Sequence, residues 1–406
     1  MKILYFSQFY KPESIAASFR ATDNAENWVK DGNSVTVFTA FPNYPTGRVF
    51  YGYRVRLLVK QTIEGVKVLR SKLIIKPNTS MLNRLENALS FFLFGLYNIC
   101  FNCKKIGKEY DVVLGSSGTI FAALLGWAYS AIYSKPFVFE IRDITYKQMI
   151  ATGKKESNIT VIGMKFLELF LAKRAKKVVV VTNGFKNILI NDGIKADKIH
   201  VITNGVDVNI AKQKNEPKLV LSYYGTLGIS QNIVDTFAYS DVIKSKVINF
   251  EYLIIGEGAQ KSLIRAEIQN NQENYINLMD GMSSDELEQY YCLTKLSVVT
   301  IKKSDSFKDT IPSKIFQIMG RGIAVLFIGP EGEAAEIIRK YNAGIVLTDT
   351  VKSDLAVLEE FFSKGDWKAV LEQMGKNGAE AVAKYYSRKT LAYEYLDVLK
   401  SATEKE

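Results

Sequence analysis

The chain has 406 residues, 47% of them hydrophobic, which is enough for two domains that each bury their own core. Its formal net charge is +11, and the excess lies in the first half: residues 1–205 carry 29 Lys+Arg against 14 Asp+Glu, whereas residues 206–406 carry 24 against 28. Three cysteines are too few for a disulfide framework, and a strand-like run begins at Ile3 without a signal-peptide pattern before it. We therefore expect a reduced, cytoplasmic protein and not a disulfide-stapled secreted one.

Short runs rich in β-branched and aromatic residues alternate with helix-length segments along the first half. These runs cover residues 3–7, 34–40, 66–71, 111–117, 137–143, 177–182 and 199–205. Such alternation is typical of a parallel sheet with helices on both faces. After the polar stretch AKQKNEPK, a second series covers residues 219–225, 250–258, 275–281, 296–301, 323–329 and 343–347. The sequence therefore predicts an α/β fold with two Rossmann-like, doubly wound domains.

The domain boundaries follow from these two series. We expect an N-terminal domain over residues 1–205, a C-terminal domain over residues 206–385 and a linker near residues 206–218. A helical period continues beyond Trp367, and residues 386–406 are expected to form a helix that returns to the N-terminal domain. Ligands of such sheets bind beyond the carboxyl ends of the strands, so function is expected in the loops that follow each strand.

A helix predicted over residues 81–105 is unusually apolar. One face, expected to rest on a core, is marked at spacings of three and four by Leu82, Leu85, Leu89, Phe92, Leu96, Ile99 and Cys103. The residues off that stripe and the lysines after it are candidates for contact with an anionic membrane surface: Phe91, Phe94, Phe101, Lys104 and Lys105. An ordinary buried helix is the alternative interpretation.

Histidine-based or metal-based chemistry is not expected. The one histidine, His200, lies inside a predicted strand, which disfavours a catalytic triad or a histidine metal site. The chain also lacks an Asp-x-Asp pair of the kind that holds a divalent ion against a diphosphate. An anionic ligand is therefore expected to be met by protein groups, without a metal or other cofactor.

Groups suited to an anion gather at predicted strand ends of both domains. Pro312, Ser313 and Lys314 open a predicted helix, where a lysine opposes the helix dipole unless an anion lies beside it; a lysine in water is the alternative. The strand ends YYGTLG (223–228) and GEG (256–258) contain glycines. The small residues that start a helix after the first strand can offer backbone N–H groups to a phosphate, and they begin with Ser14, Ile15 and Ala16.

Several segments, taken in order, resemble family 4 glycosyltransferases. They are FYKPESIAASFRATDNAENWVKDGNSVTVFTAFPNYPTGR, FVFEIRD, TNGFKNILINDGIKADKIHVITNGVD, YYGTLGISQNIVD, IIGEGAQKSLI and IPSKIFQIMGRG, followed by EGEAAEII and NAGIVL. The resemblance covers nearly the whole chain and is closest to the fucosamine (2-acetamido-fucose) transferases of bacterial O-antigen and capsule clusters. It implies a GT-B fold with two domains facing across a cleft, a donor held mainly by the C-terminal domain, an acceptor held by the N-terminal domain, no metal, and retention of configuration.

The resemblance also implies which residues bind the donor. They are Gly225, Thr226, Gly256, Glu257, Asp309, Pro312, Ser313, Lys314 and Gln317, with Ser14, Ile15 and Ala16 in a loop near donor and acceptor. The family's Glu-x7-Glu motif falls on Asp309 and Gln317, so this chain departs from it at both positions. The Gln317 carbonyl can still accept from a ribose hydroxyl. Asp309 is one methylene shorter than glutamate, and Asp305 competes with it for the sugar-side role. Lys314 is then the main cation on the leaving diphosphate.

Similar transferases carry a polar residue near the acceptor hydroxyl at the end of the strand FVFEIRD. This implies that Arg142 and Asp143 contact the acceptor, with a structural Arg142–Asp143 pair as the alternative. Asn43 and Tyr44, in the loop FPNYPTG, are expected on the acceptor side, unless the loop's prolines only shape it. The expected catalytic residues are Asp143, Asp309 and Lys314.

The resemblance implies a retaining, metal-independent hexosyltransferase of bacterial surface polysaccharide biosynthesis. It is expected to move a sugar, such as N-acetyl-fucosamine or another N-acetylated hexose, from a UDP-sugar to a polyprenyl-diphosphate-linked acceptor of O-antigen, capsule or lipopolysaccharide. The basic first half and the apolar helix predict a peripheral position on the inner face of the inner membrane. Two alternatives stay open: a UDP-sugar epimerase of the same fold, and a non-enzymatic binder of anionic lipid or nucleic acid.

Overall fold

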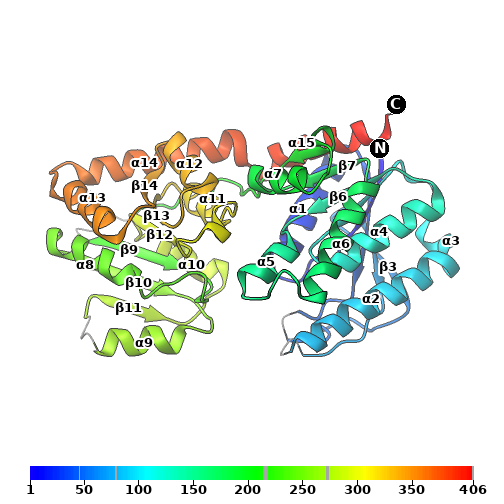
Figure 1. The fold of residues 1–406 in the computed structure, drawn as a ribbon, viewed down its shortest axis with the longest axis horizontal. Coiled ribbons are helices and arrows are strands. Elements are labelled where there is room, and N and C mark those ends of the chain that lie inside the picture. Colours follow the sequence, from blue (N-terminus) through cyan, green and yellow to red (C-terminus); the bar gives the residue numbers. More distant parts are fainter. Residues whose placement is uncertain (45, 78–79, 214–217, 271–273, 405–406) are drawn as a thin grey trace. The chain divides into compact units, whose positions relative to one another are not determined.

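The computed structural model describes residues 1–44, 46–77, 80–213, 218–270 and 274–404. The chain forms two compact units, which are coloured along the sequence in Figure 1. Unit 1 comprises Met1–Thr203 and Arg388–Glu406, and unit 2 comprises Asn204–Ser387. Each unit has its own mainly parallel sheet with helices around it, so the predicted α/β class with two Rossmann-like domains is confirmed.

Unit 1 is built on an eight-stranded sheet in the order β3-β4-β2-β1-β5-β6-β7-β8. Its elements are β1 Lys2–Phe6, α1 Ala16–Lys30, β2 Ser34–Ala40, β3 Leu58–Ile63, β4 Val66–Ser71, α2 Met81–Phe101, α3 Cys103–Ile106, β5 Val112–Ser116, α4 Ile120–Tyr133, β6 Phe137–Ile141, α5 Thr145–Ala151, α6 Ile159–Arg174, β7 Lys177–Val180, α7 Asn183–Asn191, the 3-10 turn Ala196–Lys198, β8 Ile199–Val201 and α15 Arg388–Thr403. The edge strand β3, which the sequence pattern does not predict, pairs antiparallel with β4 through a tight turn at Glu64 and Gly65.

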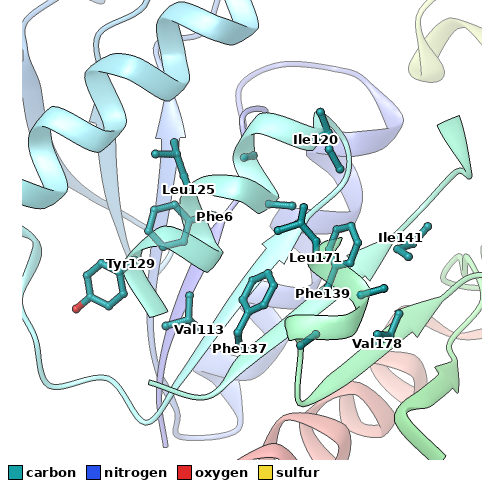
Figure 2. Packing of buried hydrophobic residues seen from close by; sticks show 14 of the residues in the cluster. Phe6, Val113, Ile120, Leu125, Tyr129, Phe137, Phe139, Ile141, Leu171 and Val178 are labelled. Atoms are coloured by element: carbon teal, nitrogen blue, oxygen red, sulfur yellow. The ribbon is translucent and has the colours of Figure 1, made fainter. Parts of the chain in front are cut away.

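Helices cover both faces of this sheet. On one face, side chains such as Leu125 of α4 and Leu171 of α6 pack over the strands (Figure 2). On the other face, α1 packs against α15: the indole Nε1 of Trp28 donates to the Ala392 carbonyl, and the Trp28 and Tyr395 rings lie 5.4 Å apart. The predicted return of the C-terminal helix to the first domain is therefore confirmed.

Unit 2 is built on a six-stranded parallel sheet in the order β11-β10-β9-β12-β13-β14. Its elements are β9 Leu219–Tyr224, α8 Thr236–Lys246, β10 Phe250–Ile255, α9 Lys261–Asn270, β11 Ile276–Met279, α10 Ser284–Tyr291, β12 Leu296–Thr300, the 3-10 turn Asp305–Phe307, α11 Lys314–Met319, β13 Ala324–Ile328, α12 Glu333–Lys340, β14 Gly344–Leu347, α13 Val351–Ser363, α14 Trp367–Ala381 and the π-helical turn Val382–Tyr386.

In each sheet the strand order reverses once. The first strand of unit 1, β1, lies between β2 and β5, and the first strand of unit 2, β9, lies between β10 and β12. Loops that leave the carboxyl ends of two such strands diverge to opposite faces and leave a crevice where ligands bind. The loops after β1 and β5 and those after β9 and β12 are therefore the places to look for a site.

The predicted linker is in part a packed segment of unit 2. The amide of Asn209 donates to the Gly320 carbonyl at 2.9 Å, and that of Ala211 donates to the Arg321 carbonyl at 3.0 Å. Val206 and Ala211 are buried in the same core. Residues 214–217 of the predicted linker lie outside the described residues.

Helix α2 turns a different side to the sheet from the one predicted. Its buried side includes Asn87, Ser90, Phe91, Asn98 and Ile99. By contrast, the first three leucines of the predicted core face, Leu82, Leu85 and Leu89, are 76%, 49% and 41% exposed. The prediction of the core face is therefore wrong for these leucines.

Hydrogen bonds of the α2 amides explain this orientation. Asn87 accepts from the Gln8 side chain at 2.7 Å. Asn98 donates to the Leu57 carbonyl at 3.0 Å and to the Ser71 hydroxyl at 3.1 Å. A buried amide needs such partners, and these partners all lie on the sheet side of the helix.

The orientation of α2 also decides which of the predicted membrane-contact residues are exposed. Phe91 is fully buried, with its ring 6.1 Å from that of Phe38, so the prediction that it contacts a membrane is wrong. Phe94 is half-buried, and Phe101 is 74% exposed. Lys104 and Lys105 are exposed. No helix in the described part of the chain combines the length and the apolarity needed to span a bilayer.

Candidate functional site

Lys314 of unit 2 lies against the end of the first strand of its sheet. Its Nζ donates to the Tyr223 hydroxyl at 2.6 Å and lies 4.2 Å from the centre of the Tyr223 ring. A Cβ placed on Gly225 would lie 2.6 Å from Lys314 Cε and 2.8 Å from Nζ. Gly225 also has φ +123°, which disfavours other residues. Only glycine at position 225 leaves room for the Lys314 side chain at the carboxyl end of β9.

The environment of Lys314 is poor in counter-charge. Burial lowers the pKa of the Lys314 ammonium to about 8. Among the residues that the structure describes, no carboxylate forms an ion pair with it. A partly desolvated cation without a carboxylate partner favours binding of an anionic ligand beside it.

The glycine-containing turns after β9 and β10 interlock tightly. The Gly225 amide donates to the Ile255 carbonyl at 2.9 Å. A Cβ on Gly256 would lie 1.8 Å from the Gly225 carbonyl oxygen, and one on Gly258 would lie 2.3 Å from that of Leu227. The turns can therefore approach each other only because they carry glycine.

Other groups of these turns are available to a ligand. Thr226 is exposed, and its backbone amide and that of Gly228 have no hydrogen-bond partner among the described residues. Glu257, predicted to bind the donor, accepts from Lys261 at 2.6 Å and from the Gly281 amide at 3.1 Å. Its carboxylate is thus held toward the loop after β11.

The loop between β12 and α11 brings the remaining predicted residues of unit 2 to the same edge. The Lys302 amide donates to the Ser230 carbonyl at 2.8 Å, which ties this loop to the one after β9. The Lys303 ammonium pairs with the buried Asp354 and donates to the Asp349 carbonyl at 2.8 Å. The loop before Lys314 is therefore anchored on both sides.

The two positions at which this chain departs from the Glu-x7-Glu motif lie before and after Lys314 in the sequence. Asp309 is half-buried in the turn before α11, and Gln317 is exposed on α11, three positions after Lys314 and on the same face of the helix. Neither side chain has a hydrogen-bond partner among the described residues. Pro312 is half-buried, while Ser313 and Asp305 are exposed.

In unit 1, the predicted residues lie beyond adjacent strands. The Arg142 amide, after β6, donates to the Ser117 hydroxyl, after β5, at 2.9 Å. A Cβ on Gly118 would lie 3.4 Å from the Cβ of Ala17 in the first turn of α1. The start of α1, with Ser14 and Ile15 before it and Ala16 as its first residue, therefore lies near the loop after β5.

Arg142 and Asp143 form no ion pair with each other in the described residues, contrary to the alternative of a structural pair. The Nε of Arg142 is buried and has no hydrogen-bond partner in the described part of the chain, which leaves a donor for a ligand. Asp143 is exposed, but protein atoms around its carboxylate desolvate it and raise its pKa, an effect that the Arg142 cation opposes.

Asn43 supports the loop after β2 from inside. It is 2% exposed, and its side chain donates to the Phe41 carbonyl and accepts from Asn87 at 3.3 Å. The structure thus gives Asn43 internal contacts in place of the expected ligand contact. Tyr44 is half-buried, and its ring lies 5.7 Å from that of Phe9.

Glu13 and Tyr223 contact predicted site residues, and the sequence analysis did not name them. The buried Glu13 carboxylate accepts from the amides of Asn43 and Tyr44 at 2.9 and 3.0 Å, and burial raises its pKa although these bonds oppose the shift. The Tyr223 hydroxyl accepts the hydrogen bond from Lys314. The position of Tyr223, two residues before a glycine at a strand end, is a signal that could have identified it.

Metal-binding side chains form no ligand group in the described part of the chain. The described residues contain no cluster of three or more His, Cys, Asp or Glu side chains placed to hold a metal ion. His200 lies half-buried on β8, where burial lowers the pKa of its imidazole, and is not at the carboxyl edge of the sheet near Arg142.

Comparison with known proteins agrees with the family 4 resemblance. Residues 18–210 match the model of Glycosyltransferase Family 4. The chain is 22% identical over 341 residues to an Escherichia coli (strain K12) protein named "Putative colanic acid biosynthesis glycosyl transferase WcaI", a match that covers 79% of this chain and 82% of that protein. Both matches support a glycosyltransferase of family 4.

Solved structures show the same fold over nearly the whole chain. Sucrose-phosphate synthase from Thermosynechococcus elongatus has a TM-score of 0.70 at 11% identity, covering 99% of this chain and 98% of that one. Anabaena HepE in complex with UDP has a TM-score of 0.67 at 15% identity, covering 99% and 100% of the two chains. HepE has also been solved with UDP-glucose. The predicted GT-B fold is thereby confirmed.

Proposed function

We propose that the protein is a retaining glycosyltransferase that moves a sugar from a UDP-sugar to a polyprenyl-diphosphate-linked acceptor in bacterial surface polysaccharide biosynthesis. The observation that carries this proposal is the partly buried Lys314 cation beside Gly225, which forms no ion pair with the described carboxylates and lies at the reversal of strand order in unit 2. The match to WcaI and the fold of HepE, which has been solved with UDP, support it.

In this proposal, unit 2 binds the donor. The diphosphate lies beside Lys314 and accepts from the amides of Thr226 and Gly228. As the glycosidic bond breaks, negative charge grows on the leaving diphosphate, and a fixed cation in a partly desolvated crevice stabilises that charge. Lys314 replaces a metal ion in this role, so the reaction needs none. Asp309 lies on the sugar side and Gln317 on the ribose side.

Unit 1 binds the acceptor in this proposal. The buried Arg142 Nε has no hydrogen-bond partner among the described residues and can donate to the acceptor. The raised pKa of Asp143 makes its carboxylate a stronger base, as a group that accepts a proton from a sugar hydroxyl needs to be. We propose N-acetyl-fucosamine or a related N-acetylated hexose as the transferred sugar. A lipid-linked acceptor would hold the enzyme peripherally at the inner face of the inner membrane.

A thermal-shift panel of UDP, GDP and dTDP tests the donor class. A nucleotide at 100 times its dissociation constant stabilises a protein by about 2.7 kcal/mol. We expect the largest shift with UDP. Equal shifts with all three nucleotides would show that the uracil is not recognised, and no shift with any of them would contradict a nucleotide site.

The affinity for UDP is expected to depend on pH through Lys314. Because burial lowers its pKa to about 8, the free protein holds the charged form below pH 8 and loses it above. The diphosphate binds the charged form, so the dissociation constant should rise above pH 8, by up to about tenfold for each pH unit. Isothermal titration calorimetry across this range measures it, with Lys314→Met as the control that binds weakly and without this pH dependence. A constant affinity for the unmodified protein would argue against Lys314 as the partner.

A further inference from the structure

Two helices of unit 1, α2 and α6, expose apolar side chains while they bury polar ones. On α2 the exposed stripe is Leu82, Leu85, Leu89, Leu93, Tyr97 and Phe101, at spacings of three and four, and its buried side carries asparagines. On α6, Ile159, Ile162 and Phe166 are 82%, 53% and 71% exposed.

The polar residue that α6 buries is Glu168, which is 1% exposed and accepts from the Thr145 amide at 3.0 Å. This arrangement resembles that of the α2 asparagines. Both helices also bury apolar side chains on their core side, such as Leu171 of α6 and Phe91 of α2. An α-helix of a water-soluble domain normally has one apolar stripe, which faces the core, so the second, exposed stripe of each helix is unusual.

The two stripes belong to one helix layer. Helix α4 lies between α2 and α6 on the same face of the sheet: the rings of Phe92 and Phe121 lie 6.0 Å apart across α2 and α4, and those of Trp127 and Phe170 lie 4.9 Å apart across α4 and α6. Ile132 of α4 is 49% exposed in the same layer. Single exposed apolar residues are ordinary, but stripes on neighbouring helices indicate a surface that is covered in use.

Beside α6 the surface is hollowed. A cavity of about 570 Å³ lies between α5 and α6, with apolar walls that include Ile150 and Phe166. Lys147, Lys173 and Arg174 line it as well. An apolar hollow with several cations suits an amphiphile that carries a phosphate.

The charge around the two stripes is strongly positive. Residues 81–108 hold four Lys+Arg against Glu86, and residues 145–174 hold six against Glu156 and the buried Glu168, with Lys165 of these six paired to Asp192. A second copy of the chain would bring two such positive faces together, which costs free energy, whereas an anionic surface is attracted to them.

We propose that the outer face of α2, α4 and α6 docks on an anionic lipid bilayer, with the two apolar stripes inserted among the headgroups and the flanking lysines and arginines on the lipid phosphates. We call it the lipid face. The helices lie on the membrane and do not cross it. The lipid face does not depend on the proposed transfer reaction, because it concerns residues of unit 1, whereas Lys314 belongs to unit 2.

Co-sedimentation with vesicles tests this proposal. The unmodified full chain should bind vesicles of phosphatidylcholine with phosphatidylglycerol, bind phosphatidylcholine alone more weakly, and lose part of its binding as salt is raised. The double variants Leu93→Gln/Phe101→Gln on α2 and Ile162→Gln/Phe166→Gln on α6 should each reduce the partition coefficient by about tenfold or more. Glutamine keeps helix propensity high, so these variants are expected to fold.

Ile248→Gln is the matched control, since Ile248 is 91% exposed but lies in unit 2. It should leave vesicle binding unchanged. Equal binding by all variants, or no binding by the unmodified chain, would overturn the lipid face. So would light scattering that shows a dimer dissociated by the α2 and α6 variants without vesicle binding. UDP binding by the same variants is measured in parallel, so failure of the lipid face is distinguished from failure of the donor site.

Discussion

Replacing Lys314 with alanine should lower kcat for sugar transfer by about 10² to 10³-fold, the usual cost of removing one group that stabilises charge in a transition state. The physical reason is that Lys314 is the partly buried cation of this strand end, while the neighbouring Lys303 pairs with Asp354 and Lys261 pairs with Asp280. Affinity for UDP should fall as well, because the diphosphate loses its charged partner. UDP release and calorimetry measure the two effects.

Lys244→Ala is the matched control for that variant. Lys244 is an exposed lysine in the last turn of α8, at the opposite end of that helix from the loop after β9. It should leave kcat and UDP affinity unchanged. If Lys314→Ala retained both at the level of this control, the assignment of the diphosphate to the Gly225–Lys314 crevice would be wrong.

Replacing Arg20 with methionine should destabilise the protein by about 3–5 kcal/mol, the usual cost of removing one partner of a buried ion pair. The Arg20 guanidinium donates to Glu140 at 2.8 Å and to the carbonyls of Ile202 and Thr203 at 2.9 and 2.7 Å. Glu140 is fully buried and also accepts from the Tyr5 hydroxyl at 3.2 Å. Without Arg20 a carboxylate stays buried without its cation. Urea unfolding measures the loss.

Two further variants define that effect. Adding Glu140→Gln to Arg20→Met should recover part of the lost stability, because the unpaired charge is removed. Lys2→Met breaks an exposed pair with Glu109 and should cost only about 0–1 kcal/mol. If Arg20→Met cost no more stability than Lys2→Met, the buried Arg20–Glu140 pair would contribute no more than the exposed Lys2–Glu109 pair, and this prediction would be wrong.

The same pair sets a pH dependence of stability. Burial opposes ionisation of Glu140, but Arg20 and Arg142 lower the pKa of its carboxyl below the usual value overall. A group whose pKa is lowered by folding contributes stability above its unfolded pKa and loses that contribution as pH falls through the folded one. The difference between the unmodified protein and Arg20→Met should therefore shrink in acid.

Much of the fold could be predicted from local sequence. Every predicted strand is found, because fully buried parallel strands are apolar throughout. Strand β3 was missed because it is an edge strand with alternating side chains, and its two-residue turn at Glu64 and Gly65 lacks the usual asparagine or aspartate.

The orientation of α2 could not be predicted from its own residues. The apolar periodicity alone predicts that the leucines face the core. The hydrogen-bond partners of Asn87 and Asn98 are distant in sequence: Gln8 lies in the loop after β1, and Ser71 lies at the end of β4. Burial of amides with these partners outweighs burial of leucines on this helix. Such partners are known only once the fold brings them together.

The candidate site was predicted in outline and not in detail. A lysine at a helix start after a strand indicates an anion, and Lys314 lies where that reasoning places it. Its contact with Tyr223, 91 residues earlier, and the fit of its side chain against Gly225 depend on the packing of β9 beside β12. For the same reason the internal role of Asn43 was not visible in the sequence.

The most direct test of the central claim is a UDP-release assay with a panel of UDP-sugars, with and without a detergent-solubilised polyprenyl-diphosphate-linked sugar. The account predicts that UDP forms when a suitable UDP-sugar and the acceptor are both present, and that Lys314→Ala abolishes most of it. Conversion of the UDP-sugar into another UDP-sugar without acceptor and without UDP release would contradict the account and indicate an epimerase.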